Sequence, residues 1–318
     1  MFRSSRCSNN FRMSKKRIVI AGGSGFIGTA LAKEFSARDF EVIVLTRRPR
    51  ERTGGIREVV WDGEHLGEWI QCLDGAEAVI NLAGKNINCP HEPENLHAIG
   101  ASRVNSVQTL AAALEQIKTP PRVWVQASAI GYYGDIREKP CVESSPCGND
   151  ALARVCRDWE GAFDSAKTPK TRKVTLRIGF VLGANGGALP VLARLTKLFL
   201  GGAAGDGGQY ISWIHLADLV RMFVTVVEDG QSAGTYNAVV PEPVTNADFM
   251  RELRRTLHRP WSPPAPELAV RLGAWLMGSE PSLALASQWC EPKRFREAGF
   301  QFQFPRLAPA LHDLCDKI

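Results

Sequence analysis

Four glycines stand close together in the stretch IVIAGGSGFIG, which runs from Ile18 to Gly28. A run of β-branched residues precedes them and a helix-period segment follows, so the pattern predicts a strand that turns directly into a helix. Gly22 would permit the tight turn, Gly25 would let the backbone approach a pyrophosphate, and Gly28 would let the helix pack closely on its strand. The backbone N–H groups at the start of that helix would face the phosphates. We interpret the stretch as a dinucleotide-binding loop, with an empty structural turn as the alternative.

Basic residues follow the second predicted strand, in the stretch LTRRPRER. A site for NAD would place an acid there, about 20 residues after the glycines, to hold the ribose hydroxyls. Thr46, Arg47 and Arg48 occupy that position instead. A guanidinium pairs with a 2′-phosphate, whereas a carboxylate would repel it. The sequence therefore favours NADP(H) as the cofactor, and the alternative is a solvated basic loop.

Short apolar runs alternate with helix-period segments from residue 17 to about residue 185. This alternation predicts a parallel sheet covered by helices on both faces. The predicted helices are 26–38, 94–117 and 150–166, and the predicted strands are 17–21, 41–46, 57–61, 78–82, 122–127 and 173–178. The expected fold class is therefore α/β, a doubly wound parallel sheet of the Rossmann type with a smaller irregular C-terminal region.

The sequence pattern changes after Gly183. A glycine-rich stretch at 201–209 and Pro-rich segments near 241–243 and 260–266 separate further short helices. We expect an NADP-binding domain over residues 16–185, extended by a strand and a helix from about 210–240, and a mainly C-terminal substrate-side region over 186–318. The 201–209 stretch is either a lid that closes over substrate or a plain connector.

The formal net charge of +6 belongs to the N-terminal segment. Residues 1–17 contain six basic residues and no acid, so the rest of the chain is neutral and a groove for nucleic acid is not expected. We interpret residues 1–15 as a disordered basic leader, or as the product of an upstream start before Met13, in a cytoplasmic protein. Import into an organelle through this leader is the alternative.

No apolar run reaches the roughly 18 uninterrupted residues of a membrane span. The eight cysteines are scattered, with no CxxC pair and no clustered histidines, so neither a metal site nor a disulfide framework is expected. The expected partner is a small-molecule substrate, with no nucleic acid and no membrane, and a homodimer is left open.

Further motifs continue along the chain: NLAG at 81–84, SAIGYYG at 128–134, CRDWE at 156–160, LRIGFVLGANGGALP at 176–190, SWIHLADL at 212–219, PVTNADF at 243–249 and the closing AGFQFQFP. With the glycine loop, they resemble the extended branch of the short-chain dehydrogenase/reductase superfamily. Within it the chain is most similar to the atypical NADP-binding, epimerase-like subfamily, an NAD-dependent epimerase/dehydratase-like group with an extra C-terminal domain. The resemblance covers the chain from about residue 16 to its end.

The resemblance implies cofactor contacts at three strand ends and on one helix. The residues concerned are Gly22, Ser24, Gly25, Phe26, Ile27 and Gly28 at the pyrophosphate, Thr46 and Arg47 at the 2′-phosphate with Arg48 beside them, Leu82, Ala83 and Gly84 along the adenine and ribose, and Arg103 on the long helix that follows. The subfamily's usual residues are absent at Lys85, at 91–93 and at Ala98, near the expected mouth of the site. A substrate preference therefore cannot be carried over.

Proton transfer in the superfamily uses a Tyr and a Lys four residues later on one helix. Aligned on Glu160, these positions fall on Leu152 and Cys156, and neither side chain can do that chemistry. We count Leu152 among the residues that line the cofactor. Ser128 matches the superfamily's serine that orients a substrate carbonyl or hydroxyl.

Two substitutes for the missing pair are open. Tyr132 or Tyr133 would lie near the nicotinamide as a donor, or would only pack in the loop. His215 would act as an acid or base, or would cap the helix that follows it.

The leading functional prediction is an NADP(H)-dependent oxidoreductase or epimerase-like enzyme. Its substrate would be small and polar, and a nucleotide-linked compound is one candidate. Hydride would move between the nicotinamide and a carbinol or carbonyl carbon. The alternative, favoured by the missing Tyr and Lys, is a catalytically silent regulator or sensor that binds NADPH.

Overall fold

A seven-stranded parallel sheet forms the centre of the computed structural model, which describes residues 15–52 and 54–318. The strands, in sheet order, are β10 (Gly234–Ala238), β6 (Arg172–Ile178), β5 (Val123–Ala129), β4 (Ala78–Asn81), β1 (Arg17–Ala21), β2 (Glu41–Thr46) and β3 (Ile56–Val60). The order reverses between β4 and β1. In such a sheet a ligand binds in the crevice outside the carboxyl ends of the strands at that reversal.

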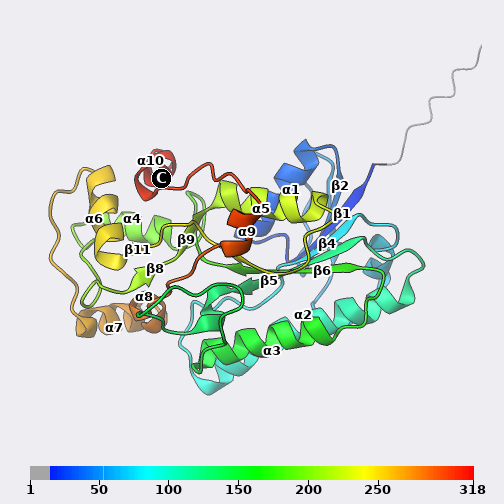
Figure 1. Cartoon of the computed structure of the whole chain (residues 1–318), viewed down its shortest axis with the longest axis horizontal. Helices are drawn as coiled ribbons and strands as arrows, with labels where there is room; N and C mark the ends of the chain where they lie inside the picture. The colour runs from blue at the N-terminus through cyan, green and yellow to red at the C-terminus, as the bar shows by residue number, and fades with distance from the viewer. Residues whose placement is uncertain (1–14, 53) are drawn as a thin grey trace, which may run out of the picture.

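Helices cover both faces of the sheet (Figure 1). The strand β1 shows why, because Ile18 and Ile20 pack with α1 (Phe26–Ala37) and α5 (Leu216–Glu228), whereas Val19 and Ala21 pack with α2 (Pro93–Gln116) and α3 (Ala151–Ser165). A strand that is apolar on both sides must be buried on both sides. The predicted doubly wound fold is confirmed.

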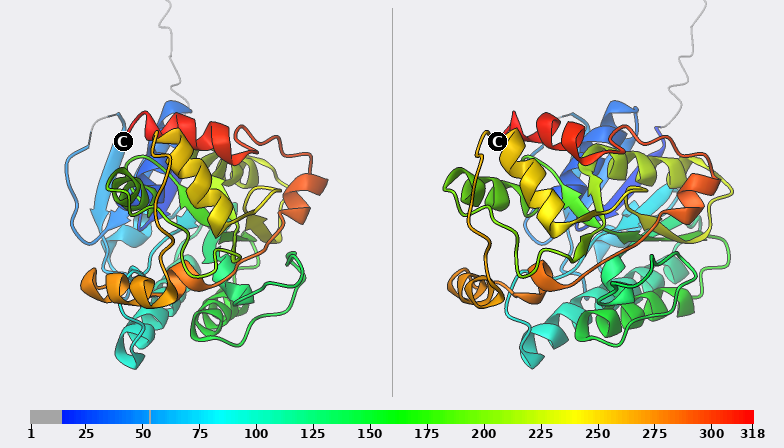
Figure 2. Two further views of the ribbon diagram at one scale, coloured as in Figure 1. Left: turned by 90° about the vertical axis from the view of Figure 1, so that its left-hand side faces the viewer. Right: turned by 60° about the vertical axis from the view of Figure 1, so that its left-hand side comes forward.

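A second, smaller core lies beside the carboxyl ends of the strands. Helices α4 (Leu189–Lys197), α6 (Asn246–Thr256) and α10 (Leu307–Cys315) pack around Trp213 and Phe249. Two small sheets join this region, one pairing β7 (Phe180–Leu182) with β9 (Trp213–His215) and one pairing β8 (Tyr210–Ile211) with β11 (Val244–Thr245). The remaining elements are α7 (Glu267–Leu276), α8 (Ser282–Leu285), α9 (Lys293–Glu297) and the short helical segments η1 (Glu68–Cys72) and η2 (Ile130–Tyr133). Figure 2 shows α4, α6 and α7 together at one end of the molecule.

All predicted strands and helices are present, with bounds shifted by at most two residues. The strands β7, β8, β9 and β11 were not predicted individually, because two or three residues are too few to show a period. The predicted leader, residues 1–15, lies outside the described residues except for Lys15. Within the described part of the chain, no helix combines the length and apolar character needed to cross a membrane.

Candidate functional site

The glycine loop between β1 and α1 contains glycines that meet different constraints. Gly22 has a φ of +72°, and a β-carbon there would lie 2.9 Å from the Cα of Ala83. At Gly28 it would lie 2.5 Å from the Cα of Gly23, so no side chain fits. Gly25 has an ordinary φ of −77°, and the nearest atom would be 3.6 Å away. The backbone around position 25 leaves room for a β-carbon. We therefore interpret the glycine there as making room for a ligand that approaches the backbone.

The start of α1 presents backbone donors at this loop. Gly25 is the N-cap residue and offers no side-chain cap, and the first turn contains no acid. The N–H groups of Ser24, Phe26 and Ile27 donate to no other described residue. Together with the positive end of the helix dipole, they form a site suited to an anion such as a phosphate.

The end of β2 lies against the same loop. The hydroxyls of Thr46 and Ser24 are 3.0 Å apart. Arg47 and Arg48 are exposed, and neither pairs with an acid in the described part of the chain. Arg52 behaves differently, because its guanidinium pairs with the carboxylate of Glu58. Two uncompensated guanidinium groups therefore remain beside the loop, as expected for recognition of a 2′-phosphate.

The end of β4 carries the NLAG motif and meets Arg103 of α2. A β-carbon on Gly84 would lie 3.2 Å from the Arg103 side chain. The Arg103 guanidinium donates to the carbonyl of Lys85 and lies 5.1 Å from the ring centroid of Trp159. It makes no ion pair with a described carboxylate, and burial lowers its pKa. A partly buried cation without an acidic partner is a candidate ligand contact.

The helix α3 places Leu152 and Cys156 where the superfamily has Tyr and Lys. Leu152 is half-buried near the start of the helix, and Cys156 is buried one turn later. Burial raises the pKa of the Cys156 thiol to about 12, so this side chain is uncharged at neutral pH. It cannot replace a lysine cation that lowers the pKa of a phenol.

A buried polar network lies under the site. The Ser128 hydroxyl donates to Glu160 at 2.5 Å, and Arg177 holds both Glu160 oxygens, at 2.9 and 2.7 Å. Arg177 also donates to the Tyr133 hydroxyl at 2.8 Å, and that hydroxyl donates to the Asn237 side chain at 2.7 Å. The predicted residues Ser128 and Tyr133 are thus brought together, but through partners inside the protein.

The two tyrosines differ in their surroundings. Tyr133 is buried, and its hydroxyl already makes two hydrogen bonds. Tyr132 is half-buried, and its ring stacks on the Arg177 guanidinium at 3.5 Å. Burial raises the pKa of both phenols, which is opposite to the shift needed for acid–base work at neutral pH. Tyr133 therefore suits a structural role, and the catalytic roles of Ser128 and Tyr132 remain predictions.

The structure also shows a contact that sequence reasoning missed. The Phe26 side chain lies where β-carbons on Gly183 and Gly186 would be, at 2.4 and 2.5 Å from its ring atoms. Phe26 therefore contributes its backbone to the glycine loop while its ring is held by the segment that leads into α4. The sequence feature that marks this contact is the stretch GANGG at 183–187, for whose glycines the sequence alone predicts no role.

Local contacts bear on two of the open alternatives. The Nδ1 atom of His215 accepts the N–H of Ala217, so His215 caps α5 as one prediction had it. The 201–209 stretch is hydrogen-bonded to other segments along its length, because Gly201 accepts from Arg254, Gly205 donates to Ala265, and Gln209 donates to Ala284. These contacts favour a connector over a lid.

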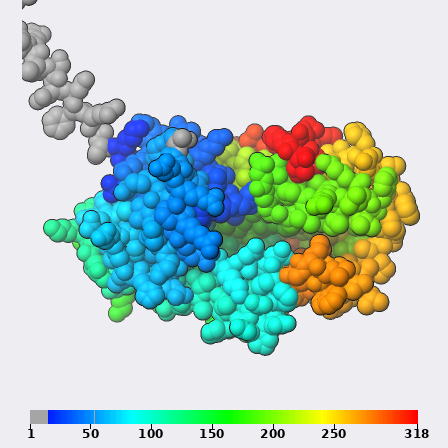
Figure 3. Space-filling model, turned by 180° about the vertical axis from the view of Figure 1, so that it is seen from behind, coloured from blue at the N-terminus to red at the C-terminus, as the bar shows by residue number. Residues whose placement is uncertain are grey.

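The opposite wall of the site joins the loop at residues 85–92 to the C-terminal region. Glu280 accepts the N–H of His91, and Ser279 contacts Asn88 through its hydroxyl. Seen from behind in Figure 3, the surface is hollowed between α4 above and the start of α2 and α7 below. No group of three or more metal-ligating His, Cys, Asp or Glu side chains occurs among the described residues.

Comparison with known proteins places this site in a family. Residues 18–239 match the family described as NAD dependent epimerase/dehydratase. The chain belongs to this family. The C-terminal part of this epimerase-family chain, residues 265–314, matches a domain of unknown function, DUF1731.

Three similar proteins show how far the family likeness extends. The Arabidopsis thaliana protein named epimerase family protein SDR39U1 homolog, chloroplastic, is 33% identical over 96% of this chain and 88% of its own length. A human crystal structure titled epimerase family protein SDR39U1 (isoform 2) with NADPH has a TM-score of 0.84 and 30% identity, covering 95% of this chain and all of that one. A Corynebacterium glutamicum structure titled nucleoside-diphosphate sugar epimerase has a TM-score of 0.76 and 33% identity, covering 95% of this chain and 58% of that one.

Proposed function

We propose that this epimerase-family protein binds NADPH at the glycine loop and acts as an oxidoreductase or epimerase on a small polar substrate. The observation that carries the proposal is the open space at Gly25, where the protein does not need a glycine but a pyrophosphate would. The crystal structure of the human relative, whose title includes NADPH, supports the same choice of cofactor.

The choice of NADPH over NADH rests on the end of β2. Thr46 and Ser24 connect that strand end to the loop, and Arg47 and Arg48 add positive charge without a paired acid in the described chain. A 2′-phosphate placed there would gain charge-assisted hydrogen bonds. NADH offers only a neutral hydroxyl at that position.

The bound cofactor would supply hydride transfer, with NADPH as the donor in a reduction and NADP+ taking up and returning the hydride in an epimerisation. The chain's own contribution would be to hold and orient the reactants. Arg103 would hold a negatively charged oxygen of the cofactor or substrate, because it is the partly buried cation at the β4 end. Tyr132, which keeps partial exposure, would be the phenol nearest to substrate, with Ser128 held in place by Glu160. Leu152 would line the cofactor as an apolar contact.

The substrate would lie between the sheet and the C-terminal region, for which we propose the bounds 186–318. A nucleotide-linked sugar is the first candidate, since the similar protein from Corynebacterium glutamicum is titled a nucleoside-diphosphate sugar epimerase. Titration of the full chain with NADPH and NADH, followed by addition of nucleotide sugars, ketones and quinones, tests the proposal. We expect tighter binding of NADPH than of NADH. A reductase would then show loss of nicotinamide absorbance with one substrate class, and an epimerase would convert a nucleotide sugar to its epimer with no net change in absorbance. Absence of affinity for both dinucleotides would contradict it.

A second candidate function is a regulator that binds NADPH without turnover. The polar network favours this alternative, because its hydroxyl groups are already hydrogen-bonded within the protein. The Ser128 hydroxyl bonds to Glu160, and the Tyr133 hydroxyl bonds to Arg177 and Asn237. Steady absorbance with every substrate class and no epimerised product, together with NADPH-dependent protection of backbone amides from exchange, is the result expected for a regulator.

We propose a cytoplasmic location, with organelle import as the competing case. The chloroplastic relative from Arabidopsis thaliana supports import. Fusion of residues 1–15 to a fluorescent protein, with imaging in the source cells, separates the two.

A further inference from the structure

Exposed apolar side chains are concentrated at one end of the molecule. Among the described residues, fourteen large apolar side chains are exposed, and eleven of them lie between residues 191 and 283. They belong mainly to the end of α4, the 257–266 linker and α7, which face the viewer together in the left view of Figure 2. A concentration of exposed apolar side chains at one end of a molecule is characteristic of an interaction site.

The helix α7 presents an apolar stripe to its surroundings. Leu268, Leu272, Trp275 and Leu276 are spaced so that they share one face of the helix, and Leu268 and Trp275 are 78% and 73% exposed. Ala274 is the one buried residue of this helix. A globular helix normally turns such a stripe toward its core, so α7 lacks a partner on this face.

Phe199 adds a second, independent observation. It follows the C-cap of α4 with a φ of +62°, a conformation that glycine adopts far more readily than an aromatic residue. Its ring is nevertheless 50% exposed. The chain therefore keeps a half-exposed aromatic side chain at a strained position, and such strain concentrates at functional sites.

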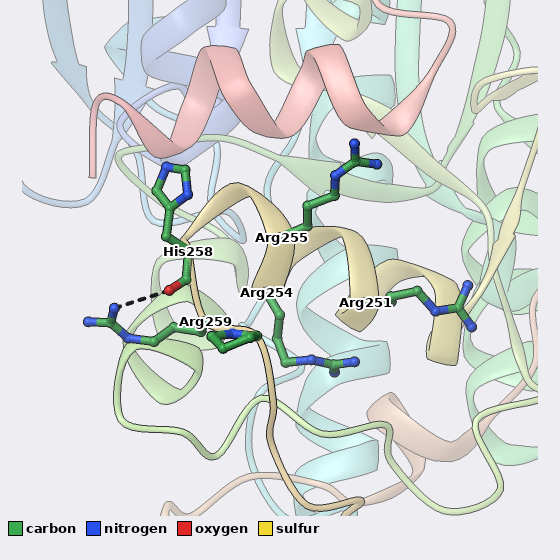
Figure 4. A pocket seen from close by; sticks show the side chains of 6 residues that line it. Arg251, Arg254, Arg255, His258 and Arg259 are labelled. Carbon is green, nitrogen blue, oxygen red and sulfur yellow. Dashed lines mark hydrogen bonds between the residues drawn. The ribbon is translucent and has the colours of Figure 1, made fainter.

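Positive charge accompanies this apolar end. Four arginines and His258 line a hollow of about 400 Å³ at the end of α6 (Figure 4). Arg254 and Arg259 donate to the carbonyls of Gly201 and Lys197, and neither they nor Arg255 pair with a described carboxylate. The Arg259 guanidinium lies 5.3 Å from the ring centroid of Phe199, so the cations and the apolar side chains adjoin.

We propose that this end of the molecule docks on an anionic lipid surface. Trp275, Leu272 and Phe199 would enter the boundary between headgroups and acyl chains, and the arginines at the end of α6 would pair with lipid phosphates. A symmetric contact between two copies would bring two uncompensated arginine clusters into one interface. An anionic membrane instead complements their charge, and it is therefore the occupant that the structure favours.

Vesicle flotation of the full chain tests the proposal. We expect binding to phosphatidylcholine vesicles that contain about one third phosphatidylglycerol and none to pure phosphatidylcholine. Arg255→Gln should weaken binding about fivefold, and Trp275→Gln at least about tenfold. Phe199→Gly should weaken binding while raising Tm, since it removes a strained conformation. Weaker vesicle binding together with a higher Tm would show that the variant has lost a lipid contact and has not unfolded.

Matched controls are available outside the segments that carry these side chains. Leu66→Gln removes an exposed apolar side chain, and Arg157→Gln removes an exposed guanidinium, so both should leave binding unchanged. The basic leader is present in every variant and its contribution cancels. Vesicle binding that is absent, or that is unaffected by Trp275→Gln and Arg255→Gln, overturns the proposal. A shift from dimer to monomer in Trp275→Gln without a change in vesicle binding overturns it in favour of a second copy.

Discussion

Gly22, Gly25 and Gly28 differ in what a β-carbon would meet. Two of them are fixed by the protein's own backbone, through a positive φ at Gly22 and a close approach to Gly23 at Gly28. Only Gly25 has room, so its identity carries information about a ligand rather than about folding. The same distinction applies to the arginines after β2, where Arg52 is paired with an acid and Arg47 is not.

Replacement of Gly25 by Val should abolish binding of both NADPH and NADH without unfolding the protein. Its β-carbon would meet only the Gly22 carbonyl oxygen, at an ordinary contact distance of 3.6 Å, so the free energy of unfolding should fall by about 1 kcal/mol, from the poorer N-cap residue. Gly28→Ala is the matched contrast, because its β-carbon would meet the Gly23 backbone and should lower Tm. Fluorescence titration with both dinucleotides and a thermal melt check the pair. Normal affinity in Gly25→Val would show that the loop does not hold phosphate.

Replacement of Arg47 by Glu should weaken NADPH about tenfold to a hundredfold, because it replaces a charge-assisted contact by repulsion. NADH has no phosphate at that position and should be nearly unaffected. Arg50→Glu makes the same change in charge nearby and should move both affinities equally and slightly. The ratio of the two dissociation constants is the readout, and an unchanged ratio in Arg47→Glu contradicts the assignment.

At the scale of elements, the polar network ties three parts of the sheet to one helix. Ser128 ends β5, Glu160 comes from α3, Arg177 from β6 and Asn237 from β10. Burial opposes the charge of Arg177, yet the hydrogen bonds and ion pair with Glu160 raise its pKa overall. The Arg177–Glu160 ion pair is buried beneath the site. Arg177 contacts Tyr132 and Tyr133, and it thereby positions η2.

Glu160→Gln should destabilise the protein by about 3–5 kcal/mol, because it leaves the Arg177 charge buried without its partner. Glu267→Gln changes an ion pair whose two side chains are each 59% exposed, and should cost less than about 0.5 kcal/mol. Urea unfolding of both variants gives the comparison. An equal loss of unfolding free energy in the two variants would mean that the Glu160–Arg177 ion pair is exposed to water in solution.

The start of α5 predicts a pH effect. Burial lowers the pKa of His215 below its ordinary 6.5. The unfolded state therefore takes up a proton first, and stability should fall as the pH drops below about 6.5. His215→Asn keeps an acceptor for the cap but does not titrate, so its Tm should depend less on pH in that range. A wild-type Tm that rises on acidification would contradict this sign.

At the scale of the whole molecule, the Rossmann half could be predicted from the sequence and the C-terminal half only in outline. Buried parallel strands such as β1 and β2 are short, continuous apolar runs rich in β-branched residues, and such runs are recognisable in the sequence. The second core depends on tertiary contacts around Trp213 and Phe249 that no local pattern encodes. The cofactor loop was predicted because its chemistry is local, whereas the Glu160–Arg177 pair joins residues from separate elements.

The stripe on α7 lay beyond prediction for a similar reason. A helical period is the same whether the apolar face turns to a core or to the surroundings. The prediction of no membrane partner considered spanning segments only, and α7, with ten residues, is too short to span. Its 73%-exposed Trp275 became visible only in three dimensions.

The packing of the Phe26 ring connects the glycine loop to the segment that leads into α4. Its ring is lodged between glycines of the segment that runs directly into α4, while its backbone opens α1. Any shift of the loop would therefore meet the segment at the base of α4 through this ring, and Phe199 lies just beyond the far end of that helix. The Phe26 ring thus joins the nucleotide loop to the helix that leads toward the end of the molecule proposed to dock on lipid.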